Sequence, residues 1–140
     1  MDTHASPDVV SLRILLVDHD VQILELLQSL LEYYGHEVRT AVSCEEALAL
    51  ASELRPQVIF TGIALLRSSG FELVKSLRER PECTDTMIVA LTGHESLLDL
   101  DFWKESGFDR IVRKPAKIEV IVEVLQDVAA SQTINVRTAI

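Results

Sequence analysis

Four short stretches of the sequence carry side chains that could do chemistry together. They are Asp18-His19-Asp20, Thr61-Gly62, Thr92-Gly93 and Lys114-Pro115. Carboxylate, hydroxyl and ammonium groups gathered at one place are typical of a site for a phosphoryl group and a divalent cation. The second stretch is unusual, because it ends on a glycine, which has no side chain to react. Whether the four stretches meet depends on the elements that carry them.

The residues before these stretches indicate strands of a sheet. Three runs are continuously apolar, as expected for strands buried on both faces: 14–17, 58–61 and 87–92. Two further runs mix polar and apolar residues, as expected at the edges of a sheet: 36–41 and 110–112. The sequence therefore favours a sheet whose second and fifth strands lie at its edges.

Helical patterns follow the strands. Asp20 is a good N-cap and Gly35 a good terminator for a first helix, whose predicted buried stripe is Ile23, Leu27, Leu30, Leu31 and Tyr34. Capping boxes of the form S-x-x-E begin the second helix at Ser43 and the third at Ser69. A fourth helical segment runs to Gly107, and a fifth follows Lys114-Pro115.

The alternation of strand and helix five times over predicts an α/β fold. We expect a doubly wound (βα)5, flavodoxin-like three-layer sandwich with a parallel sheet of strand order 2-1-3-4-5. The domain should span residues 12–130, with a flexible lead at 1–11 and a flexible tail at 131–140. In such sheets the site lies at the carboxyl ends of the strands, where all four polar stretches are found.

Composition excludes several classes of function. The net charge of −9 disfavours nucleic acid as a partner, because phosphates require a basic face. No apolar run is long enough for a membrane helix, and the first residues do not have the pattern of a signal peptide, so a cytoplasmic location is expected. Cys44 and Cys83 form no CxxC motif and are interpreted as free thiols.

The polar stretches resemble the receiver domain of two-component response regulators, over about residues 12–130. In that family the first strand ends in paired acids that bind Mg²⁺, and the third ends in the Asp that accepts a phosphoryl group from a histidine kinase. The fourth strand ends in Thr or Ser, and the fifth in Lys-Pro, whose peptide is usually cis. Asp18, Thr92 and Lys114-Pro115 match this pattern, and Thr92 lies 30 residues after Gly62 and 22 before Lys114.

Four positions depart from the family pattern. Gly62 stands where the acceptor Asp should be, His19 replaces the second acid, Leu66 replaces a Pro, and Ile111 replaces the aromatic residue that rotates on activation. A glycine cannot form an acyl phosphate, and an imidazole is a poor Mg²⁺ ligand. Asp18 and Asp20 are the only cation ligands left among the matched positions, so we expect Mg²⁺ binding to be weak or absent, and no other cofactor.

Other chemistry at this edge stays open as an alternative. Phosphate could be accepted by Thr61 or by Ser68-Ser69, although these hydroxyls also suit a strand end and a helix cap. His19 could bind a transition metal, although adjacent side chains diverge and a solvated loop capped by Asp20 explains the stretch. Lys114, without a phosphoryl partner, is expected to pair with Asp18. A flavodoxin-like ligand site is disfavoured by the acidic loop DHDVQ and by the lack of glycine-rich motifs.

A partner face is predicted on the fourth helix, fifth strand and fifth helix, which form a common dimer or partner face in receivers. Phe102 and Trp103 are adjacent, so one of them should be exposed, and Ile111, Val120 and Val124 extend the apolar surface. The expected partner is a histidine kinase or another signalling protein, with a homodimer through this face as the alternative.

The sequence is thus interpreted as a pseudo-receiver: a signalling domain, not an enzyme, that acts through protein–protein contacts. The vestigial site comprises Asp18, His19, Asp20, Gly62, Thr92, Lys114 and Pro115. The alternatives are a receiver phosphorylated at another residue and a flavodoxin-like ligand-binding domain.

Overall fold

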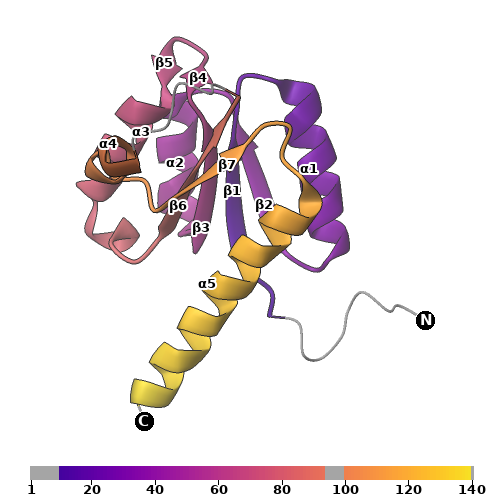
Figure 1. Ribbon diagram of the computed structural model, residues 1–140, viewed down its shortest axis with the longest axis vertical. Coiled ribbons are helices and arrows are strands. Elements are labelled where there is room, and N and C mark those ends of the chain that lie inside the picture. Colours follow the sequence, from indigo (N-terminus) through magenta and orange to yellow (C-terminus); the bar gives the residue numbers. More distant parts are fainter. Residues whose placement is uncertain (1–9, 94–99, 140) are drawn as a thin grey trace.

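A five-stranded parallel sheet forms the centre of the structure, a computed structural model that describes residues 10–93 and 100–139. The strand order is β2-β1-β3-β6-β7 (Figure 1), which confirms the predicted α/β topology. The strands are β1 (Arg13–Val17), β2 (Glu37–Ala41), β3 (Val58–Gly62), β6 (Met87–Thr92) and β7 (Arg110–Arg113).

Helices cover both faces of the sheet (Figure 1). One layer holds α1 (Val21–Tyr33) and α5 (Ile118–Ala139), and the other holds α2 (Cys44–Leu54), α3 (Gly70–Arg78) and α4 (Leu100–Glu105). A short 3-10 turn, η1 (Pro81–Cys83), follows α3. Successive strand residues point to opposite faces, so Ile14 and Leu16 pack under one layer and Leu15 and Val17 under the other. The continuous apolar runs therefore contribute side chains to two hydrophobic cores, one on each face of the sheet.

The first helix is rotated relative to the predicted stripe. Its buried residues are Leu24, Leu27 and Leu31, whereas Tyr34 is the C-cap and is 40% exposed. The chain leaves the helix at this point, because Gly35 adopts a φ of 96° that other residues rarely adopt. Part of the apolar spacing in this helix therefore lies on its solvent-facing side.

A small antiparallel hairpin after β3 was not predicted. It consists of β4 (Ala64–Leu65) and β5 (Ser68–Ser69), which are too short to give a periodic pattern. The next residue, Gly70, begins α3 directly against β3, and a Cβ atom there would overlap the carbonyl oxygen of Gly62. Glycine is therefore required at this position by close backbone approach.

The last helix is longer than predicted. It continues to Ala139, so residues 131–139 are helical although their sequence has no clear periodicity. The flexibility expected of this tail stays a prediction. No glycine or proline occurs between 131 and 139 to end the helix. In Figure 1 this end of α5 runs past the end of the sheet.

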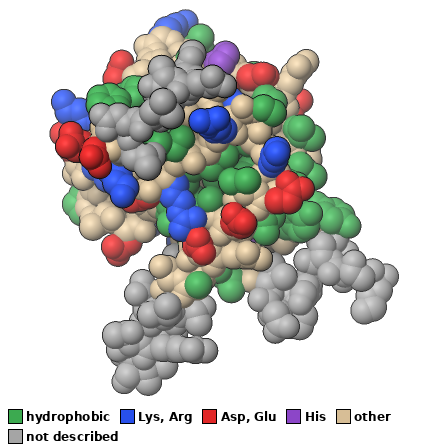
Figure 2. All heavy atoms as spheres, viewed as in Figure 1, with side chains coloured by type: hydrophobic (Ala, Val, Ile, Leu, Met, Phe, Trp, Pro, Cys, Tyr) green, Lys and Arg blue, Asp and Glu red, His purple; other side chains and the backbone are tan. Residues whose placement is uncertain are grey.

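Charged side chains of both signs are interspersed on the face that carries α5 (Figure 2). Arg110 on β7 forms an exposed ion pair with Asp127 on α5 at 2.6 Å, which links the helix to the edge strand. Within the part of the chain that the structure describes, no helix is long and apolar enough to cross a membrane.

Arg78, at the end of α3, joins four segments through its guanidinium group. Nε donates to the carbonyl of Gly107 at 3.0 Å, and Nη1 donates to the carbonyls of Cys83 and Thr86 at 3.3 and 3.0 Å. Nη2 lies 2.6 Å from Asp109 Oδ2. These acceptors lie just before β6 and β7. The Arg78 side chain therefore connects the C-terminal ends of α3 and α4 to the start of the edge strand β7.

Replacing Arg78 with Met should lower the free energy of unfolding by about 2–4 kcal/mol, because several partly buried carbonyls lose their donor. The matched control is Arg39→Met, since Arg39 lies 3.8 Å from Glu53 and both side chains are exposed. We expect the control to cost less than about 0.5 kcal/mol. Urea unfolding followed by Trp103 emission and by circular dichroism gives both values, and equal losses would contradict the role assigned to Arg78.

His36 connects the entry points of β1 and β2. Its Nδ1 accepts a hydrogen bond from the backbone N–H of Leu12 at 3.1 Å, so the folded state requires this nitrogen to be unprotonated. Burial lowers the pKa of His36 below its ordinary value of 6.5.

Stability should therefore fall as the pH drops below about 6.5, because the unfolded chain then binds a proton that the folded His36 resists. The contribution is complete above the unfolded pKa and is lost progressively toward the lower folded pKa. Unfolding free energies of the wild type and His36→Gln, measured from pH 8 to pH 5, should converge with falling pH. A constant difference across this range would show that His36 does not titrate as stated.

Candidate functional site

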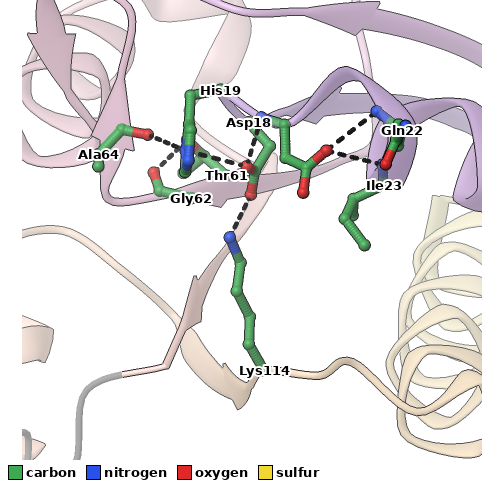
Figure 3. A network of polar contacts seen from close by, with 9 residues as sticks. Asp18, His19, Gln22, Ile23, Thr61, Gly62, Ala64 and Lys114 are labelled. Atoms are coloured by element: carbon green, nitrogen blue, oxygen red, sulfur yellow. Dashed lines mark hydrogen bonds and ion pairs between the residues drawn. The ribbon is translucent and has the colours of Figure 1, made fainter.

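The carboxyl ends of four neighbouring strands bring the predicted residues to one edge of the sheet. Val17 is in register with Thr61, Gly62 with Leu91, and Thr92 with Arg113. Asp18, Gly62, Thr92 and Lys114 therefore follow or end adjacent strands at the same height. Figure 3 shows the Lys114 side chain reaching up to Asp18 beside Gly62.

The centre of the site is an ion pair between Asp18 and Lys114. Asp18 Oδ2 lies 2.6 Å from Lys114 Nζ, and the Asp18 side chain is buried while that of Lys114 is 30% exposed. The other oxygen, Oδ1, accepts a hydrogen bond from the backbone N–H of Asp20 at 3.0 Å. The predicted pairing is confirmed, and both carboxylate oxygens of Asp18 are satisfied within the protein.

The Asp18 carboxylate occupies the space beside Gly62. A Cβ atom built on Gly62 would lie 2.6 Å from Asp18 Oδ2, 3.2 Å from its Cγ and 3.7 Å from Lys114 Nζ. The first distance is too short for a real contact, so any side chain at this position requires the ion pair to move. Glycine at residue 62 therefore has a structural consequence besides the loss of the acceptor. The space that a side chain would occupy is filled by the Asp18 carboxylate, which pairs with Lys114 there.

His19 connects the site to the β4–β5 hairpin. Its Nδ1 lies 3.1 Å from the carbonyl oxygen of Ala64 and 3.3 Å from Asp18 Oδ1, and the side chain is 58% exposed. Both neighbours are acceptors, so Nδ1 carries the proton. Figure 3 shows the imidazole between the Ala64 carbonyl and the Asp18 carboxylate, with a dashed line to each.

Asp20 serves the first helix, as predicted. Its Oδ1 accepts hydrogen bonds from the backbone N–H groups of Gln22 and Ile23 at 3.0 and 3.4 Å. This carboxylate therefore satisfies the free donors at the start of α1.

The hydroxyl groups at this edge are engaged in local structure. Thr61 is buried and donates to the carbonyl of Gly62 at 2.8 Å. Ser69 caps α3 by accepting from the N–H of Glu72 at 3.2 Å, and Ser68 accepts from the N–H of Cys44 at 3.0 Å. These contacts match the interpretation of the hydroxyls as a strand end and a helix cap.

Thr92 and the Lys-Pro pair complete the edge. Thr92 is buried, and its carbonyl accepts a hydrogen bond from the N–H of Lys114 at 2.8 Å. The peptide bond between Lys114 and Pro115 is cis. The hydrogen bond to Thr92 holds the backbone of Lys114 beside the end of β6, and its side chain reaches Asp18 from there.

Neither cysteine has the environment of a reactive thiol. Burial raises the pKa of the Cys44 thiol, and the nearby Glu72 carboxylate raises it further. Burial also raises the pKa of Cys83, which lies in the core. Among the described residues, no group of three or more His, Cys, Asp or Glu side chains is placed to hold a metal ion.

The predicted partner face is only partly exposed. Phe102 is 50% exposed and Val120 is 37% exposed, whereas Ile111 is half-buried against the core. Trp103 and Val124 are 2% and 3% exposed, so their assignment to this face is corrected. The exposed part of the face therefore consists of Phe102, Ile111 and Val120.

Packing explains both corrections. Trp103 lies 5.1 Å from the ring of Phe71 and 5.4 Å from that of Phe108, so the larger ring of the adjacent aromatic pair takes the buried place. Val124 lies three residues after Ile121 and four before Val128, both in the core, so it shares their face of α5.

Sequence reasoning missed the backbone groups of the site. The carbonyl of Ala64 holds His19, and the backbone of Gly62 presses on Gly70. Main-chain contacts of this kind carry no side-chain signature. The one available signal was Gly70 directly after the capping residue Ser69.

Comparison with known proteins identifies the family. Residues 14–126 match the family model of the response regulator receiver domain. An uncharacterised 14.6 kDa protein of Leptolyngbya boryana is 31% identical over 113 residues, covering 81% of this chain and 86% of its own length. Protein PilH of Pseudomonas aeruginosa is 26% identical, covering 84% of this chain and 98% of its own.

A solved structure has the same fold. The chemotaxis response regulator CheY4 of Vibrio cholerae superimposes with a TM-score of 0.77 and is 31% identical, covering 85% of this chain and 99% of its own. The transcriptional regulatory protein TrcR of Mycobacterium tuberculosis is 32% identical, but this chain spans only 42% of its length. The chain belongs to the response regulator receiver domain family of two-component signalling.

Proposed function

We propose that this chain is a receiver domain that works without aspartyl phosphorylation and acts through contacts with other proteins. The observation that carries the proposal is the position of Asp18 Oδ2, 2.6 Å from where a Cβ of residue 62 would lie. The nucleophile of the family is absent, and the ion pair fills the space that it would need.

The remaining groups do not favour a phosphoryl site. In the family the lysine pairs with the phosphoryl group, whereas Lys114 here is 2.6 Å from Asp18. Thr61 donates to a backbone carbonyl, and Ser69 caps a helix. These engaged groups support a structural role for the edge of the sheet.

The donor set does not fit Mg²⁺, which requires several oxygen ligands in octahedral geometry. Asp18 has both oxygens engaged, Asp20 caps α1, and Gly62 offers no carboxylate. The exposed imidazole of His19 is a nitrogen donor at the position of the second acid. We infer that Mg²⁺ binding at this edge is weak or absent.

Signalling would then depend on binding surfaces. Phe102, Ile111 and Val120 lie on α4, β7 and α5, and Figure 2 shows apolar side chains on the face that carries α5. A half-exposed aromatic ring is a common anchor for a protein partner. The expected partner is a histidine kinase or another signalling protein, and the whole protein's activity is part of this proposal, since the chain spans 42–47% of three transcriptional regulators that it matches.

The wild-type chain should gain no phosphoryl adduct when it is incubated with Mg²⁺ and acetyl phosphate. Intact mass spectrometry measures this directly, and a receiver that carries the acceptor aspartate, treated in parallel, shows that the donor is active. Gly62→Asp should also remain unmodified, because its carboxylate would be placed against Asp18. An adduct mapped to Thr61, Asp18 or Asp20 of the wild type would refute the proposal.

Gly62→Ala should lower the free energy of unfolding by about 1–3 kcal/mol, because the new methyl group forces the ion pair to move. In an Asp18→Ala background the same change should cost much less, and a double-mutant cycle measures this coupling. Gly93→Ala is the matched control, since among the described residues a Cβ there meets only Lys114 Cβ, at an ordinary 3.8 Å. Equal costs of Gly62→Ala in both backgrounds would show that Asp18 does not fill this space.

A further inference from the structure

A hollow of about 420 Å³ lies between the N-terminal end of α2 and the β4–β5 hairpin. Its apolar lining comes from Cys44, Leu48 and Leu66, and its charged lining from Glu45 and Arg67. No residue of the Asp18–Lys114 pair contributes to it. The hairpin lies at the upper edge of Figure 1, away from α5. The lining of the hollow includes none of Phe102, Ile111 and Val120.

The walls of the hollow are held in place by backbone contacts. The N–H of Leu66 donates to the carbonyl of Val42 at 2.9 Å, and the N–H of Cys44 donates to Ser68 Oγ at 3.0 Å. The Leu66 side chain is nonetheless 52% exposed. The backbone of Leu66 is therefore held in place while its side chain is exposed. It projects as a knob beside the hollow, whose apolar floor is formed by the partly buried Cys44 and Leu48.

The two charges of the hollow lack partners within the part of the chain that the structure describes. Neither Glu45 nor Arg67 makes a side-chain ion pair or hydrogen bond with a described residue. Opposite charges thus flank one apolar patch, and both remain available to another molecule.

We propose that this hollow is an interface between two copies of this chain, related by a two-fold axis. Such an interface uses the same patch on both copies, so the patch must contain both members of every complementary pair. This patch contains a projecting side chain, Leu66, and the apolar floor that could receive it. It also contains a cation, Arg67, and an anion, Glu45. Leu66 of each copy covers Cys44 and Leu48 of the other, and Arg67 of each pairs with Glu45 of the other.

Charge favours a second copy over a different protein as the occupant. A strongly basic or acidic partner would meet one like charge in this patch, whereas the patch is its own complement in charge. The net charge of −9 opposes association of two copies at long range, so the Arg67–Glu45 pairs supply the attraction at close range. Added salt screens the long-range repulsion between two copies more strongly than it screens ion pairs that are buried in the interface. Moderate salt should therefore favour the dimer.

The test is sedimentation equilibrium of the full 140-residue chain, up to high micromolar concentration, with the variants Arg67→Glu and Glu45→Arg. The wild type should form a dimer, and each variant alone should weaken it roughly tenfold or more, because each creates two like-charge pairs. An equimolar mixture of the two variants should restore the dimer, since every cross-pair is then opposite in charge. Circular dichroism confirms that each variant is folded.

Phe102→Ser is the matched control for the other face and should leave the dimer unchanged. The proposal is overturned if the wild type stays monomeric, if neither charge reversal weakens the dimer, or if the mixture fails to associate. Loss of the dimer in Phe102→Ser with none in the charge variants would place the interface on α4 and β7 instead. The outcome is independent of the acetyl phosphate experiment, which reports only on the strand-end site.

Discussion

A buried carboxylate sets the constraints at the carboxyl edge of this sheet. Asp18 has a side-chain exposure of 1%, and an ionised carboxylate in that position is stable only when opposite charge and hydrogen-bond donors surround it. Lys114 provides the charge at 2.6 Å, and the N–H of Asp20 provides a donor at 3.0 Å. Three features of the fold accommodate this carboxylate. Lys114 follows β7, the turn after β1 presents the N–H of Asp20, and residue 62 has no side chain.

The neighbouring contacts follow from the same constraint. His19 lies close to Asp18 and also holds the hairpin through Ala64, so the loop after β3 is tied to the end of β1. Gly70 then starts α3 against the backbone of Gly62. The edge that carries phosphorylation chemistry in relatives is here packed from within by side chains and backbone of the chain itself. This packing is the reason that the proposed function places signalling on binding surfaces elsewhere on the domain.

Sequence patterns predicted the elements of the fold because those elements repeat. Continuous apolar runs gave the central strands, and polar runs gave the edges. Asp18, Gly62 and Lys114 could be placed together because parallel strands share one carboxyl edge. The hairpin at 64–69 could not be predicted, because strands of two residues have no periodicity. The end of α5 could not be predicted either, because no glycine or proline marks it. Which of Phe102 and Trp103 is buried depended on Phe71 and Phe108, distant in sequence, so adjacency alone could not decide it.

The filled space beside Gly62 also bears on how this lineage can change. Restoring an aspartate there by a single substitution would press a new side chain into Asp18 and add a second negative charge beside it. That single substitution would therefore lower stability on its own. An acidic side chain at residue 62 would need compensating changes at neighbouring positions before the fold could accommodate it, so the route to it is open in one order of substitutions and closed in the other.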